Sequence, residues 1–272
     1  WDAYRAPRAP GRVLGILNVT PDSFSDGGAW LEPARAIAHG EELLAQGADL
    51  LDVGGESTRP GAEPVPAEAE LARVLPVVLA LAPRGVLSID TTKARVAAAA
   101  LAAGARVVND VSAARLEPEI LALVAEHGAG VILMHMRGSP RDMQREPRYD
   151  DVVREVAAHL RARAAAAWRA GIALDAIALD PGLGFGKDVE HNLALLRALP
   201  ELTSLGFPLV VGLSRKRFLS ALTGEERPER RAHATTAGVV LAAARGAAWH
   251  RVHDVRAARA ALTLCAALEE ED

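Results

Sequence analysis

Polar side chains that could bind a ligand or transfer protons follow a series of short apolar runs in this chain. The runs are nearly continuous in Val, Ile, Leu and Ala, and polar residues come at or just after their ends. In chain order these residues are Asn18, Glu56, Asp90, Asn109, Asp110, His135, Asp180, Ser214, Arg215, Lys216, Arg251 and His253. Carboxylates, amides, imidazoles and cations of this kind hold polar ligands and catalyse group transfer. These side chains could form one site only in a fold that brings the ends of the runs together.

The apolar runs have the composition of parallel strands that are buried on both faces. They cover residues 13–17, 49–54, 86–90, 106–110, 130–135, 176–180, 208–213 and 248–254. Segments rich in Ala, Leu, Glu and Arg with helical spacing lie between them, at 34–46, 67–81, 94–103, 117–127, 151–170, 189–199 and 232–245. Glycines that typically end helices follow five of these segments, at Gly47, Gly104, Gly128, Gly171 and Gly246.

The repeated alternation of strand and helix favours an α/β fold of the (β/α)8 TIM-barrel type. A doubly wound open sheet is the alternative. The sequence contains no internal repeat and no linker, so we predict one domain over residues 1–272. In a barrel, the carboxyl ends of the strands meet on the face where barrel enzymes carry out chemistry, and the polar residues should converge there. Asp110 is the exception, because a turn or helix cap explains it.

Composition argues against several classes of protein. The net charge of −4 argues against a nucleic-acid partner, since nucleic-acid binders tend to be basic. No run approaches the ~20 apolar residues of a membrane span, and the start of the chain has no signal-peptide pattern. The single cysteine, Cys265, excludes an intramolecular disulfide and fits a reducing compartment. We therefore expect a cytoplasmic protein that binds neither nucleic acid nor a membrane.

Four stretches that follow predicted strands are unusually long or polar. They are NVTPDSFSDGG at 18–28, GGESTRPGAEPV at 54–65, DPGLGFGK at 180–187 and SRKRF at 214–218, which begins a helix. A connection between a strand and a helix usually needs two to six residues, so the first two are longer than a turn requires. The glycine-rich segment 182–186 matches neither the Walker pattern nor the dinucleotide fingerprint in its proper context.

Together with SIDTTK, VNDVS, LMHM and RVHDV, these stretches resemble the dihydropteroate synthases. The resemblance covers about residues 11–254, with one motif for each predicted strand and in the family's order. The family fold is a (β/α)8 barrel, which agrees with the pattern above. Its enzymes join 6-hydroxymethyl-7,8-dihydropterin pyrophosphate to 4-aminobenzoate, and release 7,8-dihydropteroate and pyrophosphate. The resemblance therefore implies a transferase of folate biosynthesis with small-molecule substrates.

By resemblance, the pterin ring is bound by residues from several strands, namely Asp90, Asn109, Met134, Asp180, Phe185, Gly212 and Lys216. Asp180 would accept the two adjacent N–H groups of the pyrimidine edge, and Lys216 would donate to the ring carbonyl and its neighbouring nitrogen. Asn109 and Asp90 would meet the other ring nitrogens. Met134 and Phe185 would pack around the ring, although ordinary core packing explains them equally well.

The resemblance places the pyrophosphate near Arg251, His253 and Asn18. Arg251 would lay its guanidinium on the ring face while its donors reach the phosphate. His253 lies two residues from Arg251 and so would point the same way, although a neutral histidine at a strand end is an alternative. Mg²⁺ would bind through Asn18 and phosphate oxygens, because this ion uses few protein ligands beside phosphate.

The two long loops resemble mobile lids that cover the pyrophosphate and complete the 4-aminobenzoate site. Their candidate residues are Asp22, Ser23, Phe24, Thr58, Arg59 and Pro60, and Asp22 and Arg59 are expected to take part in catalysis. Closed lids would exclude water from a reactive cation. The helix that begins at Lys216 and Arg217 could receive the benzoate carboxylate at its first amides.

The implied mechanism is a dissociative substitution in which pyrophosphate leaves before the aromatic amine attacks. Asp90, Lys216, Arg251 and His253 would be the catalytic residues outside the loops, and Asp90 would stabilise the cation. The resemblance also implies a homodimer and inhibition by sulfonamides, which mimic 4-aminobenzoate. The alternatives are a pterin-dependent methyltransferase, which needs no pyrophosphate site, and a pterin-binding homologue without turnover. The latter predicts loss of Arg59, Lys216 or Arg251, and all three are present.

Overall fold

The computed structural model describes residues 11–20, 31–57, 61–139 and 141–269. Within these residues, eight strands form one parallel sheet in the order β6-β5-β4-β3-β2-β1-β8-β7. The strands are β1 (Arg12–Asn18), β2 (Leu50–Gly54), β3 (Leu87–Asp90), β4 (Val107–Asp110), β5 (Gly130–Met134), β6 (Ile177–Asp180), β7 (Val210–Gly212) and β8 (Trp249–Val252). A parallel bridge between Leu179 and Leu209 joins β6 to the start of β7. The sheet therefore closes into a (β/α)8 barrel, and the open-sheet alternative is wrong.

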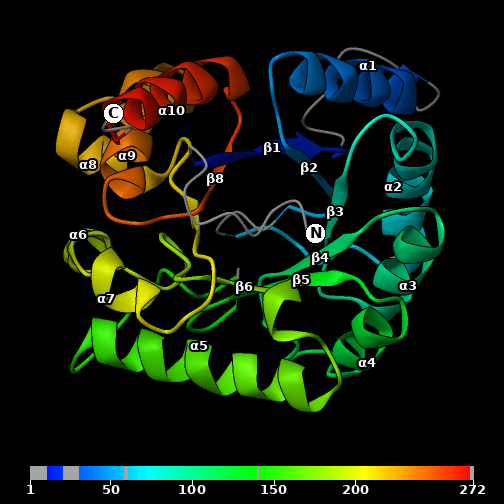
Figure 1. Cartoon of the computed structure of the whole chain (residues 1–272), viewed down its shortest axis with the longest axis horizontal. Helices are drawn as coiled ribbons and strands as arrows, with labels where there is room; N and C mark the ends of the chain where they lie inside the picture. Colours follow the sequence, from blue (N-terminus) through cyan, green and yellow to red (C-terminus); the bar gives the residue numbers. More distant parts are fainter. Residues whose placement is uncertain (1–10, 21–30, 58–60, 140, 270–272) are drawn as a thin grey trace.

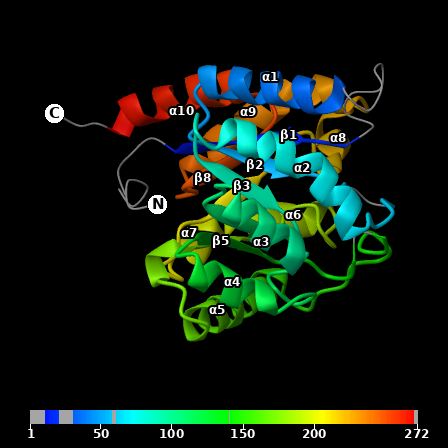
Figure 2. The same cartoon turned by 90° about the vertical axis from the view of Figure 1, so that its right-hand side faces the viewer.

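The helices form an outer ring around the strands (Figure 1). They are α1 (Leu31–Ala45), α2 (Ala67–Leu81), α3 (Ala94–Ala102), α4 (Glu119–Glu126), α5 (Val152–Arg169), α6 (Val189–Arg197), α7 (Leu199–Thr203), α8 (Arg217–Thr223), α9 (Ala232–Ala243) and α10 (Val255–Glu269), with short 3-10 turns at Leu174–Ala176 and Pro228–Arg231. Figures 1 and 2 place α5 on the opposite side of the barrel from α1 and α10. Along the described ranges, no helix is both long and apolar enough to pass through a lipid bilayer.

The predicted elements are confirmed, with small differences at their ends. Helix α2 covers 67–81 as predicted, and Gly47, Gly104, Gly128, Gly171 and Gly246 all have positive φ at the ends of helices. The segment predicted as one helix at 189–199 ends at Arg197, and the short α7 follows it. Proline is favoured in the first turn of a helix, and Pro200 occupies that turn of α7.

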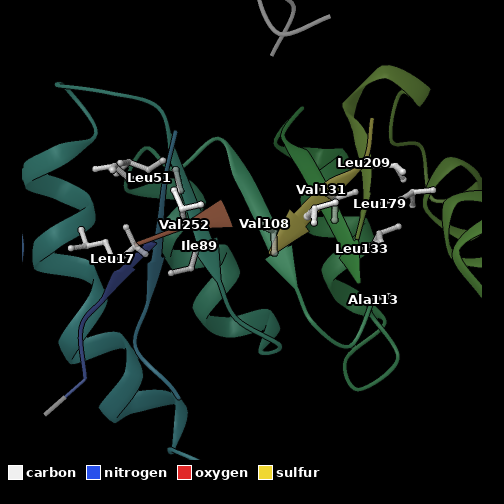
Figure 3. Close-up of a cluster of buried hydrophobic side chains, with 14 of the residues drawn as sticks. Leu17, Leu51, Ile89, Val108, Ala113, Val131, Leu133, Leu179, Leu209 and Val252 are labelled. Atoms are coloured by element: carbon white, nitrogen blue, oxygen red, sulfur yellow. The ribbon is translucent and has the colours of Figure 1, made fainter. Parts of the chain in front are cut away.

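Two apolar layers hold the barrel together. The larger one lies between the strands and the surrounding helices, where outward-facing residues such as Leu17, Ile89 and Leu133 pack (Figure 3). The smaller one fills the barrel interior and consists of Leu14, Leu50, Val107, Ile132, Ala178, Val210 and Trp249. Burial on both faces explains why the strand sequences read as nearly continuous apolar runs.

The interior changes from apolar to polar one layer further along the strands. Side chains two residues apart in a strand point to the same face. Two residues after the interior apolar layer come Ile16, Asp52, Asn109, Met134, Asp180, Gly212 and Arg251, and Asp90 on β3 is in register with Asn109. The strand register therefore gathers carboxylates, an amide and a guanidinium at the carboxyl end of the barrel.

The connection after β6 passes very close to the connection after β5. Gly182 and Gly186 have φ of +67° and +66°, and an added Cβ would overlap the carbonyl oxygens of His135 and Arg137, respectively. Glycine is required at both positions by the positive φ and by this close approach of two backbones. The glycines of DPGLGFGK thus shape the loop.

We expect Gly182→Ala to lower the free energy of unfolding by about 3 kcal/mol or more, because it combines steric overlap with an unfavourable φ. Gly128→Ala is the matched control, since Gly128 also has a positive φ of +57° but no atom lies within 4 Å of its added Cβ. This control should lose only about 1 kcal/mol. Urea unfolding of both variants measures the difference, and equal losses would contradict the close-approach explanation.

Candidate active site

The guanidinium of Arg251 is clamped between two carboxylates inside the barrel. Its Nε donates to Asp52 Oδ2 at 2.6 Å, and its Nη2 donates to Asp90 Oδ2 at 2.7 Å. The three residues come from β8, β2 and β3, so the contacts join strands that are remote in sequence. Charge-assisted hydrogen bonds of this length are strong and directional. Arg251 is thus fixed in position, and its Nη1 is left for a ligand.

Two amide side chains lie beside this clamp. Asn109 Nδ2 donates to Asp52 Oδ2 at 2.9 Å, so its own oxygen is left to accept an N–H group. Asn18 ends β1 on the other side of β2. A Cβ added to Gly54 would lie 3.7 Å from Asp90 Oδ2 and 3.9 Å from Asn18 Oδ1. Asp90, Asn109 and Asn18 therefore gather at one end of the barrel, as the sequence predicted.

Burial controls the protonation of Asp90. Removal from water raises its pKa from 3.8 to about 7, although the positive charge of Arg251 acts in the opposite direction. The negative charges of Asp52, Glu70 and Asp110 act in the same direction as burial, so the value of about 7 reflects all of these effects together. The pKa of Arg251 is raised by the carboxylates around it, so the guanidinium stays charged. The result is a carboxyl group that can change protonation near neutral pH next to a permanent cation.

Lys216 lies across the barrel mouth from the clamp. Its Nζ donates to the carbonyl oxygen of Leu183 and sits 4.5 Å from the centre of the Phe185 ring. A Cβ added to Gly212 would lie 3.7 Å from Lys216 Nζ and 3.9 Å from Arg251 Cβ. Gly212 therefore separates the two cations, and the absence of a side chain there keeps the space above it open.

Asp180 is the carboxylate on the Lys216 side. Its Oδ1 accepts the Gly182 N–H at 2.7 Å, and the side chain is buried. Burial raises the pKa of Asp180, and Lys216 counters this effect. Burial also lowers the pKa of Lys216 from 10.5 to about 8, while Asp180 raises it. A carboxylate has room for several donors, so Asp180 can still accept a pair of N–H groups from a ligand.

A buried lysine holds the loop that carries Phe185. Lys187 is only 2% exposed, and its Nζ contacts His135 Nδ1 and Gly182 O at 2.9 Å and Phe185 O at 3.0 Å. Burial lowers the pKa of His135 to about 2, so its imidazole is neutral and can accept from Lys187. His135 was expected to face the site, but its Nδ1 instead contacts this structural lysine.

All three methionines of the chain form one apolar wall beside Phe185. Met134, Met136 and Met143 pack with Val111, and Phe185 lies against them half-buried. Unbranched thioether side chains adapt their shape to the ring they contact. Met134 and Phe185 are therefore part of a small cluster at the site and lie outside the two main apolar layers.

A second, partly buried ion cluster closes the base of the loop after β2. Lys93 Nζ lies 2.7 Å from Glu56 Oε2 and also pairs with the fully buried Glu70. Glu56 Oε1 accepts the Val65 N–H at 2.7 Å. Glu56 thus ties the two ends of the loop together, and its role differs from the direct place in the site that its strand-end position suggested.

The match to known proteins covers nearly the whole chain. The family model described as "Pterin binding enzyme" matches residues 14–253. A dihydropteroate synthase of Mycobacterium leprae is 50% identical over 266 residues, which are 95% of this chain and 94% of that protein. The chain belongs to the dihydropteroate synthase family.

Solved members of the dihydropteroate synthase family have the same fold. The Xanthomonas albilineans enzyme with 4-aminobenzoic acid is 51% identical, with a TM-score of 0.91, over 96% of this chain and 94% of that one. The same bacterium's enzyme in complex with 7,8-dihydropteroate has a TM-score of 0.88 at 47% identity, covering 98% and 96%. A Yersinia pestis enzyme in a sulfonamide drug complex has a TM-score of 0.90 at 44% identity, covering 96% and 94%.

The structure describes His253, Arg217 and Asp110 from the remaining motifs, but not the residues of the two long loops. His253 lies just beyond β8, and its Nδ1 is 2.9 Å from Ser214 Oγ. Arg217 is exposed and begins α8. Asp110 accepts the N–H groups of Ser112 and Ala114, which confirms that it is a turn-capping residue. The loop residues Asp22, Ser23, Phe24, Thr58, Arg59 and Pro60 lie outside the described residues.

Sequence reasoning missed Asp52, Lys187 and Lys93. Each carried a signal that could have been used. Asp52 is the only charged residue in the apolar run LLDVG, and lysine occurs just three times in the chain. A charged side chain inside a buried strand must have a partner, but the sequence alone does not name Arg251 as that partner.

The donor set at Asn18 agrees with a magnesium ion bound together with phosphate. Among the residues that the structure describes, no group of three or more His, Cys, Asp or Glu is arranged to hold a metal by protein ligands alone. Asn18 supplies a neutral side-chain oxygen at the end of β1. Hard oxygen donors of this kind suit Mg²⁺ when substrate phosphates complete its coordination.

Burial beside Asp180 and Arg251 makes the charge of Lys216 sensitive to pH. We expect its ammonium to lose a proton as the pH rises through about 8. Only three lysines are present, so the ¹³Cε resonances of lysine-labelled protein can be followed individually. The resonance that titrates near pH 8 should be absent in Lys216→Met. In Asp180→Asn its pKa should fall further, because the stabilising negative charge is lost. A Lys216 pKa above 10 would contradict the described burial.

Proposed function

We propose that this site joins the pterin and 4-aminobenzoate by dissociative substitution. The catalytic residues outside the loops are Asp90, Lys216, Arg251 and His253. The chain is a transferase of folate biosynthesis that makes 7,8-dihydropteroate and pyrophosphate. The observation that carries the proposal is that two carboxylates and two cations gather at the carboxyl end of one barrel, with Arg251 bonded directly to Asp90. Asp180 with Lys216 supplies a ring-binding side, and Asp90 with Arg251 supplies a side for the leaving group and the developing cation.

The ring-binding side suits the edge of a pterin. Asp180 accepts the two adjacent N–H groups, and Lys216 donates to the ring carbonyl and the nitrogen beside it. Asn109 offers its amide oxygen because its Nδ2 is already used by Asp52. Phe185 and Met134 contact the ring faces. A ligand that matches all these groups leaves no buried polar atom unsatisfied, which gives specificity for the pterin edge.

The leaving group is bound at the other side of the mouth. Arg251 donates through Nη1 to the departing phosphate oxygens, and His253 donates from the end of β8. Asn18 would hold Mg²⁺ together with the pyrophosphate, and this ion would neutralise phosphate charge when bound. Asp22, Ser23, Phe24, Thr58, Arg59 and Pro60 are proposed to cover the pyrophosphate and complete the 4-aminobenzoate site. Arg217 is proposed to attract the benzoate carboxylate.

The bond changes follow from these contacts. The bond between the pterin methylene carbon and the pyrophosphate oxygen breaks, and its electron pair leaves with the oxygen. The methylene cation is delocalised into the ring, and ionised Asp90 stabilises it electrostatically. A cation beside Asp90 lowers the pKa of that carboxyl, so the charged form predominates during the reaction. The neutral aromatic amine then attacks the carbon, and its proton passes to water.

We further propose that residues 1–272 form one cytoplasmic domain that pairs with a second copy. Exposed leucines on neighbouring helices support the pairing, with Leu222 on α8, Leu241 on α9, and Leu264 and Leu268 on α10 each more than half exposed. Figure 1 shows these helices together on one side of the barrel. Nucleic acid and membranes are not proposed as partners.

The purified protein with dihydropterin pyrophosphate, 4-aminobenzoate and Mg²⁺ should release dihydropteroate and pyrophosphate. We expect Asp180→Ala and Lys216→Ala each to lower kcat/KM by about 100-fold or more, because each leaves a polar group of the bound ring unsatisfied. Arg169→Ala, at an exposed position on α5, is the control and should keep the parent activity. Tight pterin binding without release of either product would favour a binding protein or a methyltransferase.

Sulfanilamide should compete with 4-aminobenzoate for this site, since it presents the same aromatic amine with a sulfonamide in place of the carboxylate. Initial rates at several concentrations of both compounds should show a higher apparent KM for 4-aminobenzoate and an unchanged kcat. The apparent KM for the pterin substrate is the internal control. Undiminished turnover at saturating sulfanilamide would exclude a shared subsite.

A further inference from the structure

Asp52 occupies the centre of the polar layer in the barrel and has no assigned role. It lies on β2, in register with Ile16 on β1 and Ser88 on β3. Its exposed fraction is 0%. Transfer of a carboxylate from water to a buried position costs free energy, so specific interactions must compensate for it.

One oxygen of Asp52 holds two side chains that approach from different strands. Oδ2 accepts from Arg251 Nε at 2.6 Å and from Asn109 Nδ2 at 2.9 Å. Arg251 is 199 residues away in sequence and Asn109 is 57 residues away. A single oxygen thus links β8 and β4 through β2, across the interior of the barrel.

These two contacts decide which atoms the partners offer to a ligand. With Nε on Asp52 and Nη2 on Asp90, the planar guanidinium cannot rotate without breaking both bonds. Within the described residues, the N–H groups of Nη1 and the second N–H of Nη2 therefore remain to donate to a ligand. Asn109 is fixed in the same way, because the use of Nδ2 by Asp52 fixes the amide flip and leaves Oδ1 as the acceptor.

Stability alone does not explain Asp52. Its Oδ1 is buried and has no hydrogen-bond partner within the part of the chain that the structure describes. Replacing a buried ion network by apolar residues of similar volume is often neutral or stabilising. The layer directly below is filled with apolar side chains such as Leu50 and Val107. The interior of this barrel can therefore be packed without charged residues.

We propose that Asp52 is a positioning residue of the condensation, which holds Arg251 and Asn109 in the orientations that receive the pterin and its leaving group. This inference rests on the proposed function. Asp52 acts through these two side chains, since it is itself buried beneath them.

The charge of Asp52 also acts on Asp90. The charged groups that face Asp90 are Arg251 from β8, Asp52 from β2, Glu70 from α2 and Asp110 from β4. Asp52 shares Arg251 with Asp90 and repels its negative charge. Asp52→Asn should therefore leave more of the guanidinium to Asp90 and lower the pKa of that carboxyl, by about one pH unit from its value of about 7.

The test combines Asp52→Asn with Asp110→Asn as the matched control. Both lose a fully buried carboxylate of a barrel strand, but Asp110 caps a turn and makes no hydrogen bond to Arg251. In ligand-free protein, ¹³C labelling of aspartate should show the lower Asp90 pKa in Asp52→Asn and a smaller shift in Asp110→Asn. With substrates, the acid limb of the kcat/KM profile for the pterin pyrophosphate should move to lower pH in Asp52→Asn.

At the optimum pH, kcat/KM for the pterin pyrophosphate should fall by about tenfold or more in Asp52→Asn, as for other partners that orient a binding group. KM for 4-aminobenzoate should stay within about twofold, because Asp52 is not proposed to face that substrate. A merely structural role predicts a lower Tm with an unchanged kcat/KM at the optimum pH, and that outcome would overturn the inference.

Asp52→Ser is the second variant and is judged by the same criteria if Asp52→Asn does not fold. It keeps a small hydrogen-bond acceptor and leaves room for water. If the parent protein releases no pyrophosphate, the proposed function fails. The ligand-free protein then still tests the inference, because the Arg251 Nε–H proton, which is hydrogen-bonded to Asp52, should exchange with water faster in Asp52→Asn than in Asp110→Asn.

Discussion

The structure of the site depends on one buried ion network, in which Arg251 lies between Asp52 and Asp90. A guanidinium inside a barrel has to be paired, because desolvation of an isolated charge costs far more than a folded domain can supply. The network satisfies this requirement with strong charge-assisted bonds and ties β8 to β2 and β3. The same bonds fix the cation and orient Asn109 through Asp52, while burial raises the pKa of Asp90 towards neutrality against the effect of Arg251. Structural and chemical requirements are thus met by the same contacts.

The barrel makes such a network possible by stacking layers of opposite character. Leu14, Leu50, Val107 and the other interior apolar residues form a dry layer below the polar one. Low polarity beneath the carboxylates shifts the pKa values of Asp90, Asp180 and Lys216 towards the neutral range. Because side chains alternate along each strand, residues two positions after the apolar layer face the same interior and form the polar layer of the site. The apolar layer therefore contributes to the reactivity of the site as well as to stability.

The loops around the site are held by two further lysines with separate tasks. Lys187 gathers the carbonyl groups of the loop that carries Phe185, and Lys93 joins Glu56 to Glu70 at the base of the loop after β2. Loops near a site usually lack the regular hydrogen bonds that a strand or helix provides. A lysine amine supplies several N–H donors at one point, so it can satisfy loop carbonyl groups that regular backbone hydrogen bonds do not reach. All three lysines of the chain thus serve the site or the loops beside it.

The sequence by itself determined the alternation of strands and helices, the closing glycines and most of the residues at the strand ends. These features depend on local patterns, namely continuous apolar runs, helical periodicity and the positive φ that glycine tolerates. It also carried enough family motifs to indicate the activity. Only the tertiary structure decided that Asp52 pairs with Arg251, that His135 accepts from Lys187 and that Glu56 closes a loop. These contacts join residues that are 199, 52 and 9 positions apart, and their geometry follows from strand register and barrel closure, which no local pattern specifies.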